Sequence, residues 1–262
     1  MKRSKPSAWI LALVAILGVL ATALHSQEAA APQLYLMGDF LVDTSRAGEY
    51  EVAVKDLLAE LTKNDFPLRF DTYGTDDGHY YYIYEMDGYA GADRWHNAWE
   101  DFAAKVGWER FLSLHGRTAA CEIEGVYKFW TFRPDLSFLP ANERVKPEEI
   151  GYYTWDYVYV IPGKEAEFEA VNKEWIALSG KNGARDPFMT YAGGFGTVEP
   201  AYCWFEWGKS AADYAAAEEA FWKAMGEEGA ALSKKTRALI RRTESKTGRY
   251  RPDLSYAPKS QP

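Results

Sequence analysis

Two hydrophobic periodicities alternate along the chain from residue 34 onward. Residues 34–43 and 79–86 alternate apolar with mixed side chains, which predicts strands, and "FPLRFDTYG" (66–74) and "CEIEGVYKFWTF" (121–132) predict two more. Apolar residues recur at helical spacing from Tyr50 to Leu61 and again from Trp95 to Val106. "ERFLSLHG" (109–116) extends the second helix or forms a short third one. The predicted order is therefore β-α-β-β-α-β.

The same order is predicted for the rest of the chain. Strands are expected at 152–161, 186–192 and 201–207, and helices at 164–179 and 210–226. "GAALSKKTRALIRR" (229–242) adds a helical piece, and a poorly hydrophobic last strand is expected at about 243–250.

The two stretches resemble each other in sequence as well as in pattern. Five blocks of the first can be laid over the second at an offset of about 117 to 121 residues, which indicates an internal duplication. This alignment places Asp39 over Asp156 and Glu85 over Glu206. Each copy ends on a nearly identical heptad, "FRPDLSF" (132–138) and "YRPDLSY" (250–256), which we interpret as a structural strand exit.

These boundaries predict the domain organisation. The first repeat covers 34–138, a polar, Pro-containing linker covers 139–151, the second repeat covers 152–256, and 257–262 form a tail. A β-α-β-β-α-β unit is the ferredoxin-like arrangement, which covers one sheet face with helices and leaves the other face bare. Two units can bury their bare faces against each other.

The order of elements, the duplication, and the aromatic third strand followed by an acidic, Trp-containing helix resemble the dimeric α/β-barrel superfamily. Within it the chain is most similar to the NIPSNAP-like and antibiotic-monooxygenase-like groups. The resemblance implies an α+β fold in which two tandem ferredoxin-like units pack sheet to sheet as an intramolecular α/β barrel.

Strand parity predicts which acids face the barrel interior. Asp39 and Glu85 lie on the less apolar sides of neighbouring strands, so we expect them inside and close together, mirrored by Asp156 and Glu206. Paired carboxylates in an aromatic cavity are candidates for acid/base catalysis. The alternative is a structural role for all four acids, as hydrogen-bond partners or solvated strand ends.

The aromatic content indicates a ligand-binding cavity. Aromatics make up 16% of the chain, with 10 Trp and 18 Tyr, and such side chains line pockets for flat or apolar molecules. The candidate ligand contacts are Tyr35, Tyr81, Tyr202 and Trp204. The predicted function is binding of a small, partly apolar molecule. An enzyme of the monooxygenase or isomerase type, cofactor-free or haem-dependent, and a structural or partner-binding module with a filled barrel remain alternatives.

The histidines restrict the possible cofactors. None of the four lies in the second repeat, so a symmetric metal site is excluded and no metal is expected. The resemblance implies that some members bind haem through a histidine of the region that holds His96 and His115. These two are the candidates for haem, and surface histidines are the alternative. No cofactor is otherwise expected.

Charge and the N-terminus bear on partners and location. The net charge of −8 argues against nucleic acid as a partner, and a monomer or homodimer is expected. Residues 1–26 carry a basic start, an apolar run and small residues, which predicts a signal peptide followed by a disordered leader at 27–33. We therefore expect a periplasmic or secreted protein, with an uncleaved anchor as the alternative. Cys121 and Cys203 could form a disulfide there or stay as buried thiols.

Overall fold

The computed structural model describes residues 31–259. Its first half consists of β1 (Gln33–Val42), α2 (Ala47–Lys63), β2 (Asp71–Thr75), β3 (His79–Met86), α3 (Gly91–Val106), α4 (Trp108–Ala119) and β4 (Glu122–Phe132). The second half consists of β5 (Tyr152–Val160), α5 (Glu165–Lys181), β6 (Met189–Gly193), β7 (Ala201–Gly208), α6 (Ala211–Arg237) and β8 (Ile240–Tyr250). Short 3-10 helices lie at Thr44–Arg46, Pro134–Leu136, Pro147–Glu149 and Pro252–Leu254. The predicted β-α-β-β-α-β order therefore occurs twice.

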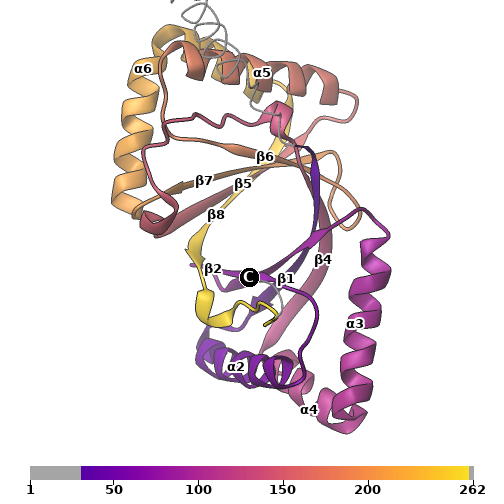
Figure 1. The fold of residues 1–262 in the computed structure, drawn as a ribbon. Helices are drawn as coiled ribbons and strands as arrows, with labels where there is room; N and C mark the ends of the chain where they lie inside the picture. Colours follow the sequence, from indigo (N-terminus) through magenta and orange to yellow (C-terminus); the bar gives the residue numbers. More distant parts are fainter. Residues whose placement is uncertain (1–30, 260–262) are drawn as a thin grey trace, which may run out of the picture. The chain divides into compact units, whose positions relative to one another are not determined.

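The strands close into one antiparallel barrel in the order β1-β3-β2-β8-β5-β7-β6-β4. Two junctions join the halves: β2 pairs with β8, and β4 pairs with β6. The helices lie outside, α2, α3 and α4 around the first half and α5 and α6 around the second (Figure 1). Closure leaves none of these strands with an unpaired edge. The predicted fold class, two ferredoxin-like units joined as an α/β barrel, is confirmed.

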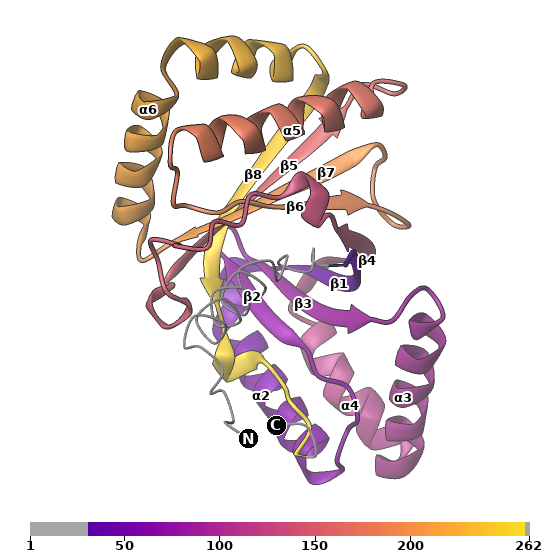
Figure 2. The same ribbon diagram turned by 45° about the horizontal axis from the view of Figure 1, so that its top comes forward.

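Each half has its own apolar core between helices and sheet. In the second half, Val158 and Val160 of β5 pack with Phe168 and Leu178 of α5 and with Met225 of α6. Figure 2 shows α5 crossing over β5 and β8 and α6 bending beside it. The bend occurs at Gly226, whose φ of 56° and ψ of −141° are not helical. At the matching place in the first half, Gly107 separates α3 from α4.

Each of the two heptads follows the last strand of one half and contacts the other half. After β4, Ser137 accepts a hydrogen bond from the backbone of Thr190, and Phe138 forms a bridge with Phe188. After β8, Ser255 accepts a bond from the backbone of Thr72 in the same way. Each heptad therefore docks on the opposite half and fastens the barrel.

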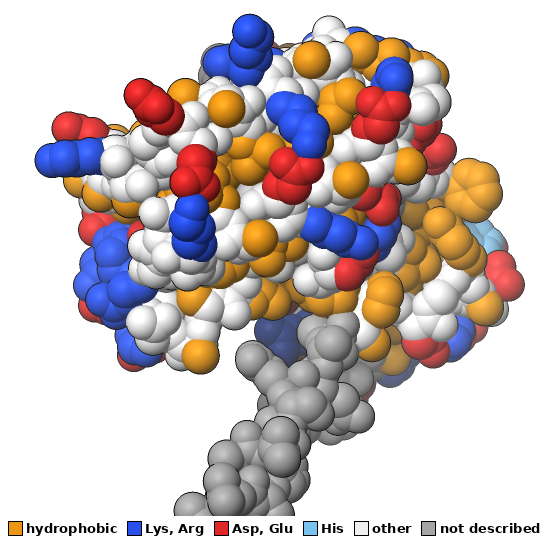
Figure 3. Space-filling view, turned by 90° about the horizontal axis from the view of Figure 1, so that it is seen from above, with side chains coloured by type: hydrophobic (Ala, Val, Ile, Leu, Met, Phe, Trp, Pro, Cys, Tyr) orange, Lys and Arg blue, Asp and Glu red, His pale blue; other side chains and the backbone are white. Residues whose placement is uncertain are grey.

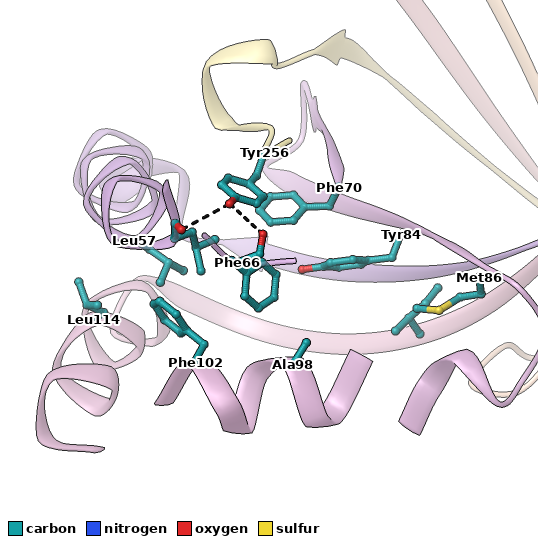
Figure 4. Close-up of a cluster of buried hydrophobic side chains, with 11 residues drawn as sticks. Leu57, Phe66, Phe70, Tyr84, Met86, Ala98, Phe102, Leu114 and Tyr256 are labelled. Atoms are coloured by element: carbon teal, nitrogen blue, oxygen red, sulfur yellow. Dashed lines mark hydrogen bonds between the residues drawn. The ribbon is translucent and has the colours of Figure 1, made fainter. Parts of the chain in front are cut away.

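The arginines of the heptads form ion pairs with helices of the opposite half. Arg133 Nη1 lies 2.9 Å from Glu169 Oε1 on α5, and Arg251 Nη2 lies 2.7 Å from Glu51 Oε2 on α2. The last residue of the second heptad, Tyr256, enters the core of the first half and donates to the carbonyl oxygen of Phe66 at 2.9 Å (Figure 4). These contacts support the structural interpretation of the heptads.

The register between the two copies differs from the predicted alignment. Leu41 and Tyr159 each directly precede the bulge in the first strand of their copy, and they lie 118 positions apart. Asp39 is therefore equivalent to Tyr157, not to Asp156. In the third strands, Tyr81 pairs with Asp39 and Cys203 pairs with Tyr157, so Tyr81 is equivalent to Cys203. The predicted superposition was one residue out in the first and third strands of the second copy.

A one-residue error moves a side chain to the opposite face of a sheet. The prediction that Asp156 and Glu206 face the barrel interior is therefore wrong. Both lie on the outer face, where Asp156 neighbours β8 and Glu206 accepts a hydrogen bond from Tyr214 of α6.

The predicted signal peptide at 1–26 and residues 27–30 of the predicted leader lie outside the described residues, whereas Gln33, the last residue assigned to that leader, begins β1. Within 31–259, no helix is both long enough and apolar enough to cross a membrane.

Candidate functional site

The barrel interior holds two cavities, one toward each end. The first has a volume of about 280 Å³ and a mainly aromatic wall made by Tyr35, Tyr73, Trp155, Tyr191 and Phe205. These rings meet largely edge to face, for example Tyr73 and Trp155 with centroids 5.5 Å apart. A wall of this kind suits a flat, apolar molecule.

The second cavity, of about 360 Å³, is lined mostly by charged and polar groups. Asp39, His79, Lys128, Glu244 and Lys246 all contribute to it. The exposed side chains of Glu124 and Val198 lie at its rim. The barrel interior is therefore apolar toward one end and charged toward the other.

Trp130 and Tyr157 lie between the two cavities. Both line both cavities, each is only 6% exposed, and their ring centroids are 5.6 Å apart. The indole N–H of Trp130 is buried and has no hydrogen-bond partner in the part of the chain that the structure describes. Leaving a buried donor unpaired is unfavourable, so an acceptor bound beside the Trp130 ring would be stabilised by this group.

Asp39 is the centre of the charged cavity. Its carboxylate, 7% exposed, lies 2.6 Å from His79 Nδ1 through Oδ1 and accepts a bond from Lys128 Nζ at 2.7 Å through Oδ2. Burial alone would raise the pKa of Asp39, but the hydrogen bonds from His79 and Lys128 and the positive charge of Lys128 outweigh it and hold the pKa below its usual value. Asp39 is therefore an ionised acceptor at neutral pH.

The bond to Asp39 selects one arrangement of the His79 ring. An ionised carboxylate only accepts, so Nδ1 carries a proton and donates it to Asp39. The other nitrogen, Nε2, lies 3.3 Å from Lys246 Nζ, whose ammonium can donate to it. Burial would lower the pKa of Lys246, but its contacts with Asp77 and Glu244 raise it, so the lysine stays charged. His79 is thus held with Nε2 as an acceptor that faces the cavity.

The predicted ligand contacts separate into two pairs. Tyr35 lines the aromatic cavity and Tyr81 the charged one, and their role as ligand contacts stays a prediction. Tyr202 and Trp204 were expected beside them, and this placement is wrong. Both lie on the outer face of β7 against Phe168 of α5, with ring centroids 4.7 and 5.9 Å away. The physical reason is the shift of register described above.

The predicted pair of Asp39 and Glu85 is not formed. Asp39 pairs with Tyr81, whereas Glu85 pairs with Tyr35, four residues along the strand, which at about 3.3 Å per residue places the two acids roughly 13 Å apart. Glu85 is exposed and borders a separate surface pocket. Asp39 instead has His79 and Lys128 as its titratable neighbours.

The two haem candidates do not fit a haem site. His96 lies on the surface of α3 and its Nε2 is 3.3 Å from Glu100 of the same helix. His115 of α4 packs against Phe111 and Trp99, with ring centroids 4.3 and 5.4 Å away. Neither histidine lines the barrel cavities, so neither is placed to bind a haem there.

Two further expectations concern cysteines and metals. Cys121 and Cys203 are both buried and free, Cys203 inside the barrel and Cys121 beside the helices of the first half, so they do not pair. Within residues 31–259, no group of three or more His, Cys, Asp or Glu side chains could hold a metal ion.

Sequence reasoning missed His79, Lys128, Trp130, Tyr157 and Lys246. His79 could have been found, because it lies two residues before Tyr81 and strand parity places both on one face. Lys128 and Lys246 occupy equivalent positions in the two copies, on the last strands. Trp130 and Tyr157 carried no separate signal, since aromatic residues are frequent on both faces of these strands.

Comparison with known proteins identifies the fold of this chain. No family model matches the chain, and no curated protein does. Among solved structures, an anthrone oxidase-like protein matches with a TM-score of 0.56 and 13% identity over 85% of this chain and 93% of that one. A mutant chlorite dismutase from Candidatus Nitrospira defluvii matches with a TM-score of 0.51 and 11% identity over 84% and 92% of the two chains.

A proposed monooxygenase from Lactobacillus acidophilus NCFM matches with a TM-score of 0.50 and 10% identity over 84% of this chain and 94% of that one. The chain therefore has the dimeric α/β-barrel superfamily fold, in a duplicated ferredoxin-like form, which confirms the resemblance found in the sequence.

Proposed function

We propose that the barrel interior binds a small, partly apolar molecule that carries a hydrogen-bond acceptor. Its apolar body would lie among Tyr73, Trp155 and Phe205, and its acceptor would meet the indole N–H of Trp130. The unpaired, buried N–H of Trp130 is the observation that carries this proposal. Trp130 lines both barrel cavities, so an acceptor bound there could pair with this donor.

Titration with 2-naphthol, followed by tryptophan fluorescence, tests the proposal. We expect saturable binding to the native protein and about tenfold weaker binding to Trp130→Phe, because one hydrogen bond is worth about 1 kcal/mol and tenfold corresponds to about 1.4 kcal/mol. Trp108→Phe is the matched control, since Trp108 is 54% exposed on α4. Naphthalene, which has no oxygen, should not distinguish Trp130→Phe from the native protein. Equal affinity of the native protein and Trp130→Phe for 2-naphthol would contradict the proposed contact.

The pair of Asp39 and His79 favours a second candidate, an acid/base enzyme. Two solved structures with this fold belong to oxygen-using proteins by their names, an anthrone oxidase-like protein and a proposed monooxygenase. The substrate would displace Lys246 from its place beside His79 Nε2. This nitrogen would then accept a proton from an acidic C–H of the substrate. O₂ would then take the electrons: one anthrone and one O₂ give one anthraquinone and one water.

Oxygen uptake with anthrone as the probe tests the enzyme candidate. We expect uptake above the uncatalysed rate, a loss of at least tenfold in His79→Gln, and a smaller loss in Asp39→Asn, which leaves the ring in place but not its tautomer. His96→Gln, on the surface of α3, is the control. Uptake that is unchanged in His79→Gln would exclude this role.

We further propose that the protein acts outside the cytoplasm, as a monomer or homodimer. The basic start and apolar run of residues 1–26 support this location. Sequencing of the N-terminus of the protein isolated from its native cells tests it. A mature chain that begins near residue 27 is expected, and an intact Met1 in a membrane fraction would favour the anchor instead.

A further inference from the structure

A third cavity lies outside the barrel, in the second half of the chain. It has a volume of about 360 Å³ and lies between the outer face of β5, β7 and β8 and the helices α5 and α6. It is separate from the barrel cavities, because its strand residues point to the outer face of the sheet and those of the barrel cavities point to the inner face. This size is within the range of small-molecule sites, roughly 300 to 1,000 Å³.

Aromatic side chains form much of its wall. Trp175 of α5, Trp204 of β7, and Phe221 and Trp222 of α6 all line it. The indole N–H groups of Trp175 and Trp204 already donate to Thr236 and Asn172, at 2.9 and 3.2 Å. These walls therefore offer a ligand mainly ring surface.

Three carboxyl groups also line this cavity, and none of them forms an ion pair with a side chain of residues 31–259. Asp156 accepts a bond from Ser245, Glu206 from Tyr214, and Glu218 from the indole N–H of Trp222. Every one of these donors is neutral. Burial and the nearby Glu218 raise the pKa of Glu206 to about 8, and burial also raises the pKa of Asp156 and of Glu218. Arg237 also lines the cavity, but it forms no ion pair with any of the three acids.

The equivalent place in the first half is filled by side chains. Asp156 and Ser245 face each other across β5 and β8 where Gly38 and Tyr127 face each other across β1 and β4. Glu206 is equivalent to Tyr84. Tyr127 packs against Phe40 and Trp95, with ring centroids 5.6 and 5.0 Å away.

The two copies therefore differ at these equivalent positions, since the first is packed with aromatic rings and the second leaves a cavity. A Cβ atom on Gly38 would lie 2.9 Å from the rings of Phe40 and Tyr127, so the first copy has room there only for its packed rings. The second copy has a carboxylate, a serine and a second carboxyl group at the matching positions, and a cavity between them. Fold maintenance does not need this cavity, because the first copy folds without it.

We propose that this outer cavity binds an organic cation with an apolar body, of the class of a primary amine attached to an aromatic ring. The apolar body would lie against Trp175, Trp204 and Phe221, and the ammonium would meet Glu206 and Glu218. A cation over aromatic faces is stabilised by the negative charge of the ring faces, and its bonds to carboxylates add to this stabilisation. The same cation removes the repulsion among the three acids.

Calorimetric titration of the full chain at pH 8 with 2-phenylethylamine tests the proposal, with 2-phenylethanol as its neutral isostere. We expect binding of the amine and at least tenfold weaker binding of the alcohol. Glu218→Gln should weaken amine binding about tenfold, whereas Glu219→Gln, the exposed neighbour on α6, should leave it unchanged. Ser245→Tyr, which places the ring of the first copy in the cavity, should abolish it.

The barrel variant Trp130→Phe separates this site from the barrel interior. Amine binding that survives in Trp130→Phe and is lost in Ser245→Tyr supports an outer site, whatever the outcome with 2-naphthol. The proposal is overturned if neither compound binds, if the alcohol binds as well as the amine, or if Glu218→Gln binds the amine like the native protein. It is also overturned if Trp130→Phe abolishes amine binding. Thermal unfolding of each variant confirms that the chain is folded.

Discussion

Asp39 is a buried carboxylate whose charge is matched by two partners from different strands. His79 belongs to β3 and Lys128 to β4, while Asp39 itself belongs to β1, so one carboxylate ties three adjacent strands together. Its equivalent in the second copy is Tyr157, and that of His79 is Ala201. The arrangement therefore exists once.

Replacing Asp39 by Asn should lower the free energy of unfolding by about 1.5 to 3 kcal/mol at pH 7, the range for hydrogen bonds to charged groups. Because the folded pKa of Asp39 is lowered, its stabilising effect is complete above the unfolded pKa of about 3.9. It is lost as the pH falls through the folded value. Urea unfolding at pH 7 and at decreasing pH measures the difference.

Glu124→Gln is the control for the Asp39 variant, since Glu124 is an exposed carboxylate at the rim of the same cavity and should change stability by less than about 0.5 kcal/mol. A difference between the native protein and Asp39→Asn that grows as the pH is lowered would contradict the assigned ion pair.

Glu206 has the opposite dependence on pH. Burial and the facing carboxylates Glu218 and Asp156 raise its pKa to about 8, while the hydroxyl of Tyr214 opposes the shift, and Arg237 lines the same cavity. A raised folded pKa stabilises the protein below the unfolded value, and this stabilisation is lost as the pH rises toward 8.

Glu206→Gln, which cannot ionise, should therefore be as stable as the native protein at pH 4, below the unfolded pKa, and more stable at pH 9, by on the order of 2 kcal/mol. Chemical unfolding of both proteins at the two pH values measures this. Equal stability at pH 9 would show that Glu206 ionises without cost.

At the scale of elements, the sequence predicted which segments are helices and strands better than it predicted their register. β5, "YYTWDYVYV", carries large apolar residues on both faces, so hydrophobicity does not say which face points inward. The alignment then placed Asp39 on Asp156, two identical residues that lie on opposite faces. The heptads, 118 residues apart, carried the correct offset for the first strand, because β4 and β8 lead directly into them.

The bend of α6 depends on one glycine. Gly226 has φ of 56° with ψ of −141°, a combination that essentially only glycine adopts without strain. Gly226→Ala should lower the free energy of unfolding by about 1 to 3 kcal/mol, although no atom lies within 4 Å of the added methyl group.

Gly116→Ala in α4 is the matched control. Gly116 is also exposed and free of nearby atoms but lies inside a regular helix, so the same substitution should stabilise the protein by about 0.5 to 1 kcal/mol. Thermal or urea unfolding compares the two, and a stabilising effect of both substitutions would mean that α6 does not bend at Gly226.

At the scale of the whole molecule, the barrel could be predicted and its contents could not. A repeated β-α-β-β-α-β order leaves two bare sheet faces, and closing them together is a general solution. Which side chains meet inside depends on parity and on which residues differ between the copies. His79 and Lys246 are 167 positions apart, and only the β2–β8 junction places them within 3.3 Å. The outer cavity could not be predicted either, because it is recognised only by comparison with the first copy, where aromatic rings fill the equivalent place.

The exchange of heptads between the halves predicts how the whole chain unfolds. Each half depends on contacts from the other half. Arg251 and Tyr256 bond to residues of the first half, and Arg133 bonds to a residue of the second. We expect one unfolding transition, coincident by far-ultraviolet circular dichroism and tryptophan fluorescence. Arg251→Met should lower the free energy of unfolding by about 1.5 to 3 kcal/mol through loss of the bonds to Glu51 and Asp253.

Arg133→Met should cost a similar amount, because its bonds to Glu169 and Asp135 mirror those of Arg251. The two networks share no residue, so the double variant should show the sum of the two effects within about 0.5 kcal/mol. Both single variants should still unfold in one step, since the β2–β8 and β4–β6 junctions remain paired. Two separate transitions in either variant would show that the halves are independent domains and that the heptads only link them.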